Sequence, residues 1–228
     1  MKIALKHIVA RTYKPLLIKY LSKIRTYKYE DIQLEISPEV FHPGFFFSTK
    51  LLLKYIKQLS LRSQRFFEPG CGSGLISIYA AKKGAFVTAT DINPVAIEFL
   101  KKNSRMNQVE LKLIQSDLFQ NIPIQQFDII AINPPYYKKQ PQTTRDYAWQ
   151  CGENGEYFKN LFAELNNYIH PATEVYMVLF DGCDIEMITN MAAQNDFNLR
   201  CVLTNENLLE KNFIFKIIRM GSPEERME

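Results

Sequence analysis

The sequence has few of the features that mark secreted, metal-binding or membrane proteins. Only four of its 228 residues are cysteine and three are histidine, and none of them forms a C-x-x-C pair or a metal-ligand spacing. We therefore expect free thiols in a cytoplasmic protein, with neither a disulfide framework nor a metal site. The apolar runs have strand length and cannot cross a bilayer, and the N-terminus lacks the apolar block of a signal peptide.

Acidic residues are absent from the first 28 positions, which carry eight basic residues. The other 200 residues hold 20 basic and 24 acidic side chains, so a basic arm precedes a slightly acidic body. Such an arm favours an anionic partner such as RNA or the ribosome. It fits equally well a solvated helix face that packs on the domain through its apolar residues. We assign residues 1–35 to a basic helical extension and residues 36–228 to the main domain.

Strands and helices are predicted to alternate from residue 65 onward, which is typical of a parallel sheet with helices on both faces. The predicted fold class is α/β, with a Rossmann-like, seven-stranded, mostly parallel sheet that ends in an antiparallel hairpin. The expected strands cover residues 65–68, 85–91, 111–115, 128–133, 173–180, 197–203 and 213–219. The expected helices cover the first 30 residues in one or two pieces, then residues 51–59, 75–83, 94–107, 156–168 and 184–194. Residues 31–36 are expected to be extended, and Asn93 is expected to cap the helix that begins at Pro94.

The first strand of this sheet ends in a glycine-rich turn directly before a helix, with Glu68, Gly70, Cys71, Gly72 and Gly74 in order. Glycines let a ligand approach the backbone, and a helix N-terminus favours a polar ligand. The G-x-G-x-G spacing is tighter than the G-x-G-x-x-G of dinucleotide sites. The Glu68 carboxylate would repel a pyrophosphate but tolerate the cationic methionyl end of S-adenosylmethionine. The turn is therefore a candidate site for that cofactor, although a tight strand-to-helix connection also explains it.

Acidic residues follow the next two strands as well. Asp91, with Ile92 after it, lies where a carboxylate can accept hydrogen bonds from both ribose hydroxyls, as it also does in NAD enzymes. Asp117 can accept from an adenine amino group while Leu118 lies against the ring, and a turn cap is the alternative for Asp117. Because the carboxyl ends of parallel strands meet at one edge of the sheet, the three segments predict one nucleoside-binding crevice.

The fourth strand ends in the tetrapeptide Asn133-Pro134-Pro135-Tyr136. The prolines fix the backbone and remove two N–H donors, so the Asn133 side-chain oxygen and the Pro134 carbonyl can accept both hydrogens of a planar –NH₂ group. Such acceptors stabilise the positive charge that an amide or nucleobase nitrogen gains when it attacks a methyl group. Tyr136 offers a ring on which the planar group can stack. The tetrapeptide therefore predicts methyl transfer to nitrogen by rigid placement, with a simple turn as the alternative.

Together these segments resemble the N-P-P-Y methyltransferases, especially the HemK family and its small-domain relatives, over residues 36–219. The resemblance implies a class I methyltransferase domain in which Asn133 and Pro134 hold the acceptor and Asn133 also borders the cofactor. Residues 40–49 resemble the family's pre-domain motif, so Phe46, Ser48 and Thr49 would close the pocket over the methionine end. An apolar segment that Ser48 caps before the helix at 51–59 is the alternative.

The resemblance leaves the acceptor open between a protein glutamine amide and an exocyclic amine of adenine or guanine in RNA. Residues 148–157 resemble a stretch of the release-factor glutamine methyltransferases, which implies a release factor or a ribosomal protein as partner. The basic arm with its tyrosines favours RNA, and 35 residues cannot replace the helical domain with which bacterial release-factor enzymes dock their substrate. Two other classes remain: a nicotinamide-dependent oxidoreductase, which the glycine spacing opposes, and a non-catalytic cofactor-binding module, which the intact tetrapeptide opposes.

Overall fold

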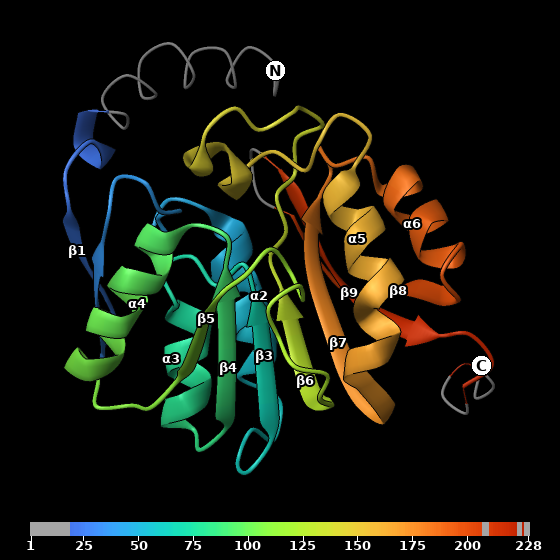
Figure 1. The fold of residues 1–228 in the computed structure, drawn as a ribbon, viewed down its shortest axis with the longest axis horizontal. Coiled ribbons are helices and arrows are strands. Elements are labelled where there is room, and N and C mark those ends of the chain that lie inside the picture. Colours follow the sequence, from blue (N-terminus) through green and yellow to red (C-terminus); the bar gives the residue numbers. More distant parts are fainter. Residues whose placement is uncertain (1–18, 207–209, 223–224, 226–228) are drawn as a thin grey trace.

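The computed structural model describes residues 19–206, 210–222 and 225. A seven-stranded sheet with the order β5-β4-β3-β6-β7-β9-β8 runs through the centre of the molecule (Figure 1). Strands β3 to β7 are parallel to one another, and β9 is antiparallel to both β7 and β8, which confirms the predicted sheet and its terminal hairpin. The strands of this sheet are β3 (Arg65–Pro69), β4 (Phe86–Asp91), β5 (Lys112–Gln115), β6 (Phe127–Ile132), β7 (Ile169–Phe180), β8 (Phe197–Glu206) and β9 (Lys211–Arg219).

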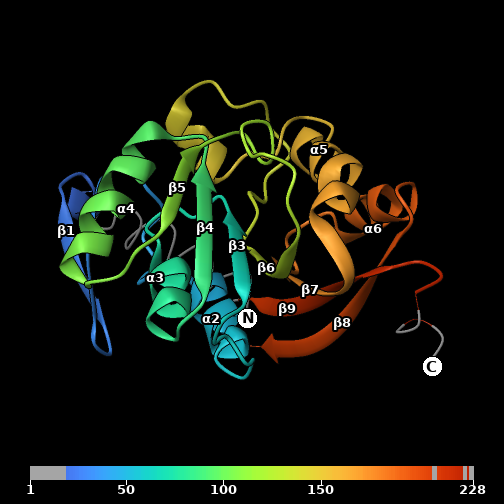
Figure 2. The same ribbon diagram turned by 60° about the horizontal axis from the view of Figure 1, so that its bottom comes forward.

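Helices cover both faces of the sheet. Figure 2 shows α5 and α6 on one side of β7 and β9 and α2 on the other side. Helix α3 packs against β3 and β4, and α4 packs against β4 and β5. The helices are α2 (Phe47–Ile56), α3 (Leu75–Lys82), α4 (Pro94–Met106), α5 (Glu156–Leu165) and α6 (Ile185–Ala193), with short 3-10 turns η1 (Thr144–Ala148) and η2 (Asn166–Tyr168).

Successive residues of the central strands enter two different cores. Phe66 and Phe67 are both fully buried, but Phe66 packs into the core beneath α2 and α3 and Phe67 into the core beneath α5. Ile129 and Ile130 divide in the same way in β6. Because both faces are covered, these strands are apolar almost throughout, and each such side chain contributes about 1.5–3 kcal/mol by burial. This double burial holds the strand ends that carry the site.

A separate antiparallel hairpin of β1 (Arg25–Tyr29) and β2 (Ile32–Ile36) precedes the main sheet. The helix that we expected over residues 25–29 is therefore wrong. The side chains of β1 alternate between partial burial, at Arg25, Tyr27 and Tyr29, and exposure, at Thr26 and Lys28, which is a strand pattern. The extended conformation expected for residues 31–36 is confirmed, and the helix expected within residues 1–18 lies outside the described residues.

Two asparagines, one in α4 and one at its C-cap, fasten the hairpin to the domain. The Asn103 amide accepts from the Glu35 N–H at 2.8 Å and donates to the Glu35 carbonyl oxygen at 2.9 Å. The Asn107 amide makes the same pair of bonds with Gln33, at 3.0 and 2.6 Å. These two side chains satisfy backbone groups of β2 that would otherwise need another strand. The hairpin therefore spans the boundary expected near residue 35.

Two expected helix starts had different outcomes. Asn93 accepts from the Val95 N–H at 2.9 Å with Pro94 at the first helical position, so the expected cap of α4 is confirmed. Helix α2 begins at Phe47, several residues earlier than expected, and its N-cap, Phe46, makes no side-chain bond. Ser48 is therefore a buried helical residue, and its interpretation as a helix cap is wrong.

In the described part of the chain, no helix is both long enough and apolar enough to cross a bilayer. Across the same ranges, no group of three or more histidine, cysteine, aspartate or glutamate side chains is arranged to hold a metal ion. The four cysteines are free thiols, two of them buried.

The order of the strands reverses between β3 and β6. From β3 the chain moves outward to β4 and β5 and then returns to β6 on the opposite side. Loops that leave neighbouring parallel strands in opposite directions open a crevice at the carboxyl ends of those strands. The predicted site segments at 68–74, 91–92, 117–118 and 133–136 follow β3, β4, β5 and β6, so all of them belong to this edge.

Candidate functional site

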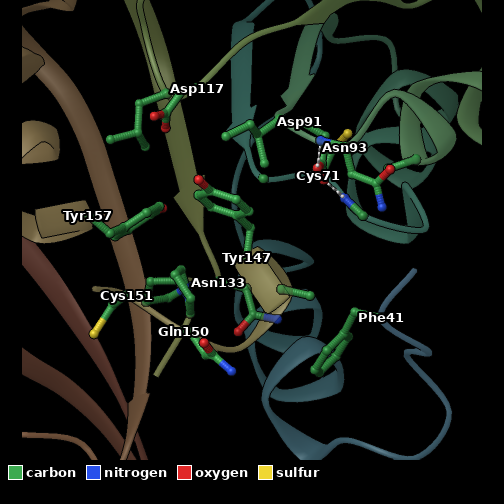
Figure 3. Close-up of a pocket in the computed structure, with 18 of the residues that line it drawn as sticks. Phe41, Cys71, Asp91, Asn93, Asp117, Asn133, Tyr147, Gln150, Cys151 and Tyr157 are labelled. Atoms are coloured by element: carbon green, nitrogen blue, oxygen red, sulfur yellow. Dashed lines mark hydrogen bonds between the residues drawn. The ribbon is translucent and has the colours of Figure 1, made fainter. Parts of the chain in front are cut away.

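A cavity of about 270 Å³ opens at the carboxyl ends of β3 to β6 (Figure 3). Most of the predicted site residues line it. These are Thr49, Glu68, Gly70, Cys71, Gly72, Asp91, Ile92, Asp117, Leu118, Asn133, Pro134, Pro135 and Tyr136. Phe46, Ser48 and Gly74 are not part of its wall. The fold therefore brings together Thr49 and four segments that lie far apart in the sequence.

The glycine-rich turn needs glycine for two different reasons. Gly74 is the N-cap of α3 with φ 79°, and a Cβ there would lie 2.1 Å from Cδ1 of Leu100. Gly70 has φ 67°, but a Cβ there would meet no atom within 4 Å. Because Gly70 lines the cavity, its Cβ would instead take up ligand space. Gly74 thus permits close helix packing, whereas Gly70 keeps the cavity open.

Asp91 is fixed by the turn that it faces. Its Oδ2 accepts from the Gly72 N–H at 2.8 Å, and its Oδ1 accepts from the Asn93 N–H at 2.9 Å. Burial raises the pKa of this carboxyl group, and the two N–H groups oppose that rise. Each carboxylate oxygen can accept more than one hydrogen bond, so Asp91 can still bind hydroxyl groups in the cavity. The turn and the end of β4 are therefore one hydrogen-bonded unit.

Glu68 is buried at the end of β3. Its Oε2 accepts from the Ser77 N–H at 2.8 Å and from the Ser77 hydroxyl. Burial raises its pKa to about 8, with the nearby Asp91 adding to the rise, so the fold favours the protonated form of Glu68. The repulsion of a pyrophosphate by Glu68, on which the sequence argument relied, is therefore weaker than expected. A cation in the cavity would favour the ionised form.

Asp117 differs from the other two carboxylates, because it has no hydrogen-bond partner for its side chain among the described residues. It is half buried, and this burial raises its pKa. The next residue, Leu118, is buried and has φ 47°, a conformation that non-glycine residues seldom adopt. Such strain is concentrated at ligand sites. Asp117 therefore does not cap a turn with its side chain, and its carboxylate is available to a ligand.

The Asn133 amide is held on both sides. Its Nδ2 donates to the Thr49 hydroxyl at 3.1 Å, and its Oδ1 accepts from the Tyr136 hydroxyl. The second lone pair of Oδ1 remains available, so the amide can still accept a hydrogen from a substrate. Burial raises the pKa of Tyr136, whose ring packs edge-on against Phe180 with centroids 5.0 Å apart. Tyr136 therefore orients Asn133, which the sequence did not predict, and its stacking role stays a prediction.

The chain returns to the tetrapeptide after passing through η1. The N–H groups of Tyr136 and Tyr137 both donate to the Trp149 carbonyl oxygen, at 3.0 and 2.7 Å. The Cys151 N–H donates to the Tyr137 carbonyl oxygen at 2.9 Å. The segment that begins at Trp149 therefore runs alongside the end of the tetrapeptide, and both segments contribute to the cavity wall.

Two polar cavity residues were missed by the sequence analysis. Oε1 of Gln150 and Oη of Tyr157 are buried without a hydrogen-bond partner in the described chain. Figure 3 shows Tyr157 pointing into the cavity from the side of α5. A buried polar atom without a partner is costly, which makes each of them a candidate for ligand binding. Their position within the glycine-bearing stretch at 148–157 was the only signal in the sequence.

An aromatic cluster closes another side of the cavity. Phe41 lines the wall, and its ring lies 4.3 Å from Phe46 and 4.8 Å from Trp149 between centroids. Phe46 and Trp149 are themselves 4.7 Å apart. Phe46, which we expected to close the pocket, thus supports Phe41 from behind, and the sequence analysis did not single out Phe41.

The cavity fits the predicted cofactor. Asp91 and Asp117 can accept hydrogen bonds from hydroxyl and amino groups, and the open space beside Gly70 admits a ligand close to the backbone. The orphaned Tyr157 hydroxyl gains a partner from any polar ligand that reaches it. A pyrophosphate would instead bring negative charge near Asp91. A cationic nucleoside therefore suits these residues better than a dinucleotide.

The family model described as Methyltransferase small domain matches residues 32–158, a range that includes every predicted site residue. A Methanocaldococcus jannaschii protein named "Putative protein N5-glutamine methyltransferase" is 37% identical over 146 residues, which cover 61% of this chain and 72% of that protein. The ribosomal protein L11 methyltransferase of Thermosipho africanus is 37% identical over 105 residues, or 45% of this chain and 40% of that protein. The chain thus spans less than half the length of this second relative.

A solved structure shows the same fold. The 16S rRNA N2 G1207 methyltransferase of T. thermophilus, in complex with AdoMet and guanosine, matches with a TM-score of 0.64 at 16% sequence identity. The match covers 87% of this chain and 50% of that chain. At this identity the likeness shows the fold alone.

Proposed function

Because the chain belongs to the methyltransferase small domain family and is an S-adenosylmethionine-dependent N-methyltransferase, we propose that its acceptor is the side-chain amide of a protein glutamine. The observation that carries the proposal is the Asn133 amide, which lines the same cavity as Asp91 and Asp117 and keeps one acceptor site of its oxygen available. The family match supports neither a nicotinamide-dependent oxidoreductase nor a non-catalytic module.

On this proposal the two sides of the cavity have different tasks. Asp91 accepts from the ribose hydroxyls, and Asp117 accepts from the adenine amine while Leu118 lies against the ring. Glu68 and the turn at Gly70 border the methionine part, and a nearby positive charge favours the ionised form of Glu68. S-adenosylmethionine, when bound, supplies a methyl group carried on a cationic sulfur.

The acceptor nitrogen is a poor nucleophile, because its lone pair is delocalised into the amide. The Oδ1 of Asn133 and the carbonyl oxygen of Pro134 accept its two hydrogens and so favour the pyramidal nitrogen that can attack. Thr49 and Tyr136 fix the Asn133 amide, so these oxygens need no reorganisation during the reaction. When the nitrogen forms its bond to the methyl carbon, the methyl–sulfur bond would break with its electron pair going to sulfur. The cationic nitrogen would then release one of its two hydrogens to water as a proton.

A protein acceptor is supported by the relative that is 37% identical over 146 residues, whose printed name specifies N5-glutamine methylation. The support for RNA is weaker, because the likeness to the rRNA enzyme is one of fold. We place the reaction in the cytoplasm, with which four free cysteines are compatible. A release factor or a ribosomal protein is the partner that we propose.

The test is to incubate the protein and labelled S-adenosylmethionine with an extract of cells that lack its gene. We expect the label to resist ribonuclease, to be released by protease, and to correspond to one added methyl group on a glutamine by peptide mass spectrometry. Asn133→Ala is the control and should leave the extract unlabelled. Label released by ribonuclease would show that the acceptor is a nucleobase and not a glutamine. The proposal would also be contradicted if the wild-type protein labelled no macromolecule at all.

A further inference from the structure

The hydroxyl of Tyr157 is an unexplained polar group within the cofactor side of the cavity. Its Oη is buried and has no hydrogen-bond partner among the described residues. Other buried tyrosine hydroxyls in this protein do have partners: Tyr168 donates to the Ile122 carbonyl oxygen at 3.0 Å, and Tyr176 donates to the Glu174 carboxylate at 2.8 Å. The missing hydrogen-bond partner is therefore specific to the position of Tyr157 and is not a general feature of buried tyrosines in this protein.

The position of the Tyr157 ring is set by the start of α5. Its backbone N–H donates to the Cys151 carbonyl oxygen at 3.0 Å, and its ring packs edge-on against the fully buried Phe158 with centroids 5.3 Å apart. Figure 3 shows the ring directed from α5 into the cavity, on the side where Asp117 lies. The hydroxyl is thus held in place before any ligand arrives.

Two chemical facts narrow what this hydroxyl binds. Burial raises the pKa of Tyr157, and the charges of Asp117 and Asp91 add to the rise, so the hydroxyl keeps its proton and can donate it in a hydrogen bond. Asp117 accepts only, because it is a carboxylate. The edge of adenine presents an amine that donates, next to a ring nitrogen that accepts. A carboxylate and a hydroxyl at one end of the cavity match that pair.

We propose that Tyr157 is a cofactor-binding residue whose hydroxyl donates a hydrogen bond to a ring nitrogen beside the adenine amine, while Asp117 accepts from the amine itself. This inference rests on the cofactor placement described under the proposed function. With both residues, the cavity recognises the edge of adenine through two hydrogen bonds, whereas the Asp117 carboxylate alone would recognise only the amine. The bond from Tyr157 also explains why a buried hydroxyl is kept without a partner in the protein.

The test compares the wild-type protein with Tyr157→Phe, which loses only the hydroxyl. We expect calorimetry to show that S-adenosylhomocysteine binds the variant about 3- to 10-fold more weakly, the effect of one neutral hydrogen bond. Because the substitution also removes an unsatisfied buried group, the ligand-free variant should melt about 2–4 °C higher than the wild-type protein. A residue with a purely structural role would not shift these two readouts in opposite senses.

Tyr176→Phe is the matched control, because its hydroxyl is bonded to Glu174 and lies outside the cavity wall. It should lower the melting temperature and leave the affinity for S-adenosylhomocysteine unchanged. The 1-deaza and 7-deaza analogues of S-adenosylhomocysteine, each of which lacks one ring nitrogen beside the amine, then identify the contact. One of them should bind the wild-type protein more weakly and show no further loss with Tyr157→Phe.

The outcomes separate this inference from the proposed function. Failure of the wild-type protein to bind S-adenosylhomocysteine would contradict the cofactor placement itself. Binding that is equal in the wild-type protein and in Tyr157→Phe would refute the role of Tyr157 alone. If Tyr157→Phe weakens the binding of both deaza analogues as much as that of the parent compound, the hydroxyl does not reach a ring nitrogen and the inference fails.

Discussion

The cofactor side and the acceptor side of the cavity are built in different ways. On the cofactor side Asp91 and Glu68 end central strands, and backbone N–H groups of the adjoining turn and helix fix their carboxylates. On the acceptor side the loop beyond the tetrapeptide carries Tyr137 and Tyr147, which are 53% and 40% exposed, and Gln150, whose amide oxygen has no partner in the described chain. An invariant ligand can be met by rigid strand ends, whereas a variable one is met by a loop.

The largest effect should come from Asn133, which directly follows the end of β6 and for which we propose a role on the acceptor side. Asn133→Ala removes an acceptor that acts on the developing charge, so methyl transfer should fall about 10²- to 10³-fold. The rate of label transfer to the protein substrate measures this loss. The affinity for S-adenosylhomocysteine should stay within about twofold, because the proposed function places Asn133 against the acceptor and not against the ribose. A large loss of cofactor binding in Asn133→Ala would show that the cofactor side and the acceptor side are not separate.

Substitutions at two glycines of the same turn should separate an effect on packing from an effect on ligand binding. Gly74→Ala places a Cβ 2.1 Å from Leu100 at φ 79°, so it should lower the free energy of unfolding by about 2–4 kcal/mol. Gly70→Ala meets no atom within 4 Å and should cost only the backbone strain, about 1–2 kcal/mol, while weakening cofactor binding. Urea denaturation and calorimetry measure the two effects. Equal stability losses would show that Gly74 is not a packing residue.

Removal of different carboxylates on the cofactor side should weaken cofactor binding by different factors. Asp91→Ala removes a carboxylate that also organises the turn, so the Kd for S-adenosylhomocysteine should rise about 10- to 100-fold. Asp117→Ala removes a half-buried carboxylate without partners in the described chain, and about 3- to 10-fold is expected. Calorimetry at one pH and salt concentration gives both values. An unaltered Kd for Asp91→Ala would exclude Asp91 from the site.

The last prediction concerns the pH dependence of stability. The pKa of Glu68 is about 8 in the folded protein against an ordinary value of 4.5, so between these values the folded state binds a proton that the unfolded state lacks. Stability should therefore fall as pH rises through this window, by at most about 1.4 kcal/mol per pH unit. Glu68→Gln keeps an oxygen for Ser77 and should lack this slope in urea denaturation between pH 5 and 8. Parallel slopes for both proteins would contradict the shifted pKa.

Most of the fold could be predicted because the strands and helices of the sheet have simple local causes. The apolar strands from β3 to β6 are buried on both faces, and Asn93 with Pro94 marks a helix start that the structure confirms. Residues 25–29 were wrongly expected to be helical, because the hairpin that they form is held through its second strand by Asn103 of α4 and by the C-cap residue Asn107. That contact joins segments about 70 residues apart.

The residues of the candidate site likewise divide into those that the sequence could predict and those that depend on contacts between distant segments. Residues at the ends of strands could be predicted, because the carboxyl edge of a parallel sheet gathers them whatever the loops do. Gln150, Tyr157 and Phe41 were missed, since their side chains reach the cavity only through loop pairing and aromatic packing. The role of Tyr136 was also incomplete, because its hydroxyl meets Asn133 through the conformation of the turn.

The pairing of the segment after Trp149 with the end of the tetrapeptide has a consequence for how new specificities arise. Backbone hydrogen bonds, which do not depend on side-chain identity, pair the segments on either side of residues 140–148, so replacing these residues should leave the paired segments in place. Grafting this stretch from a relative with another acceptor should redirect selectivity while the reacting groups stay aligned. The same architecture would let duplicated genes diverge in target without rebuilding their chemistry.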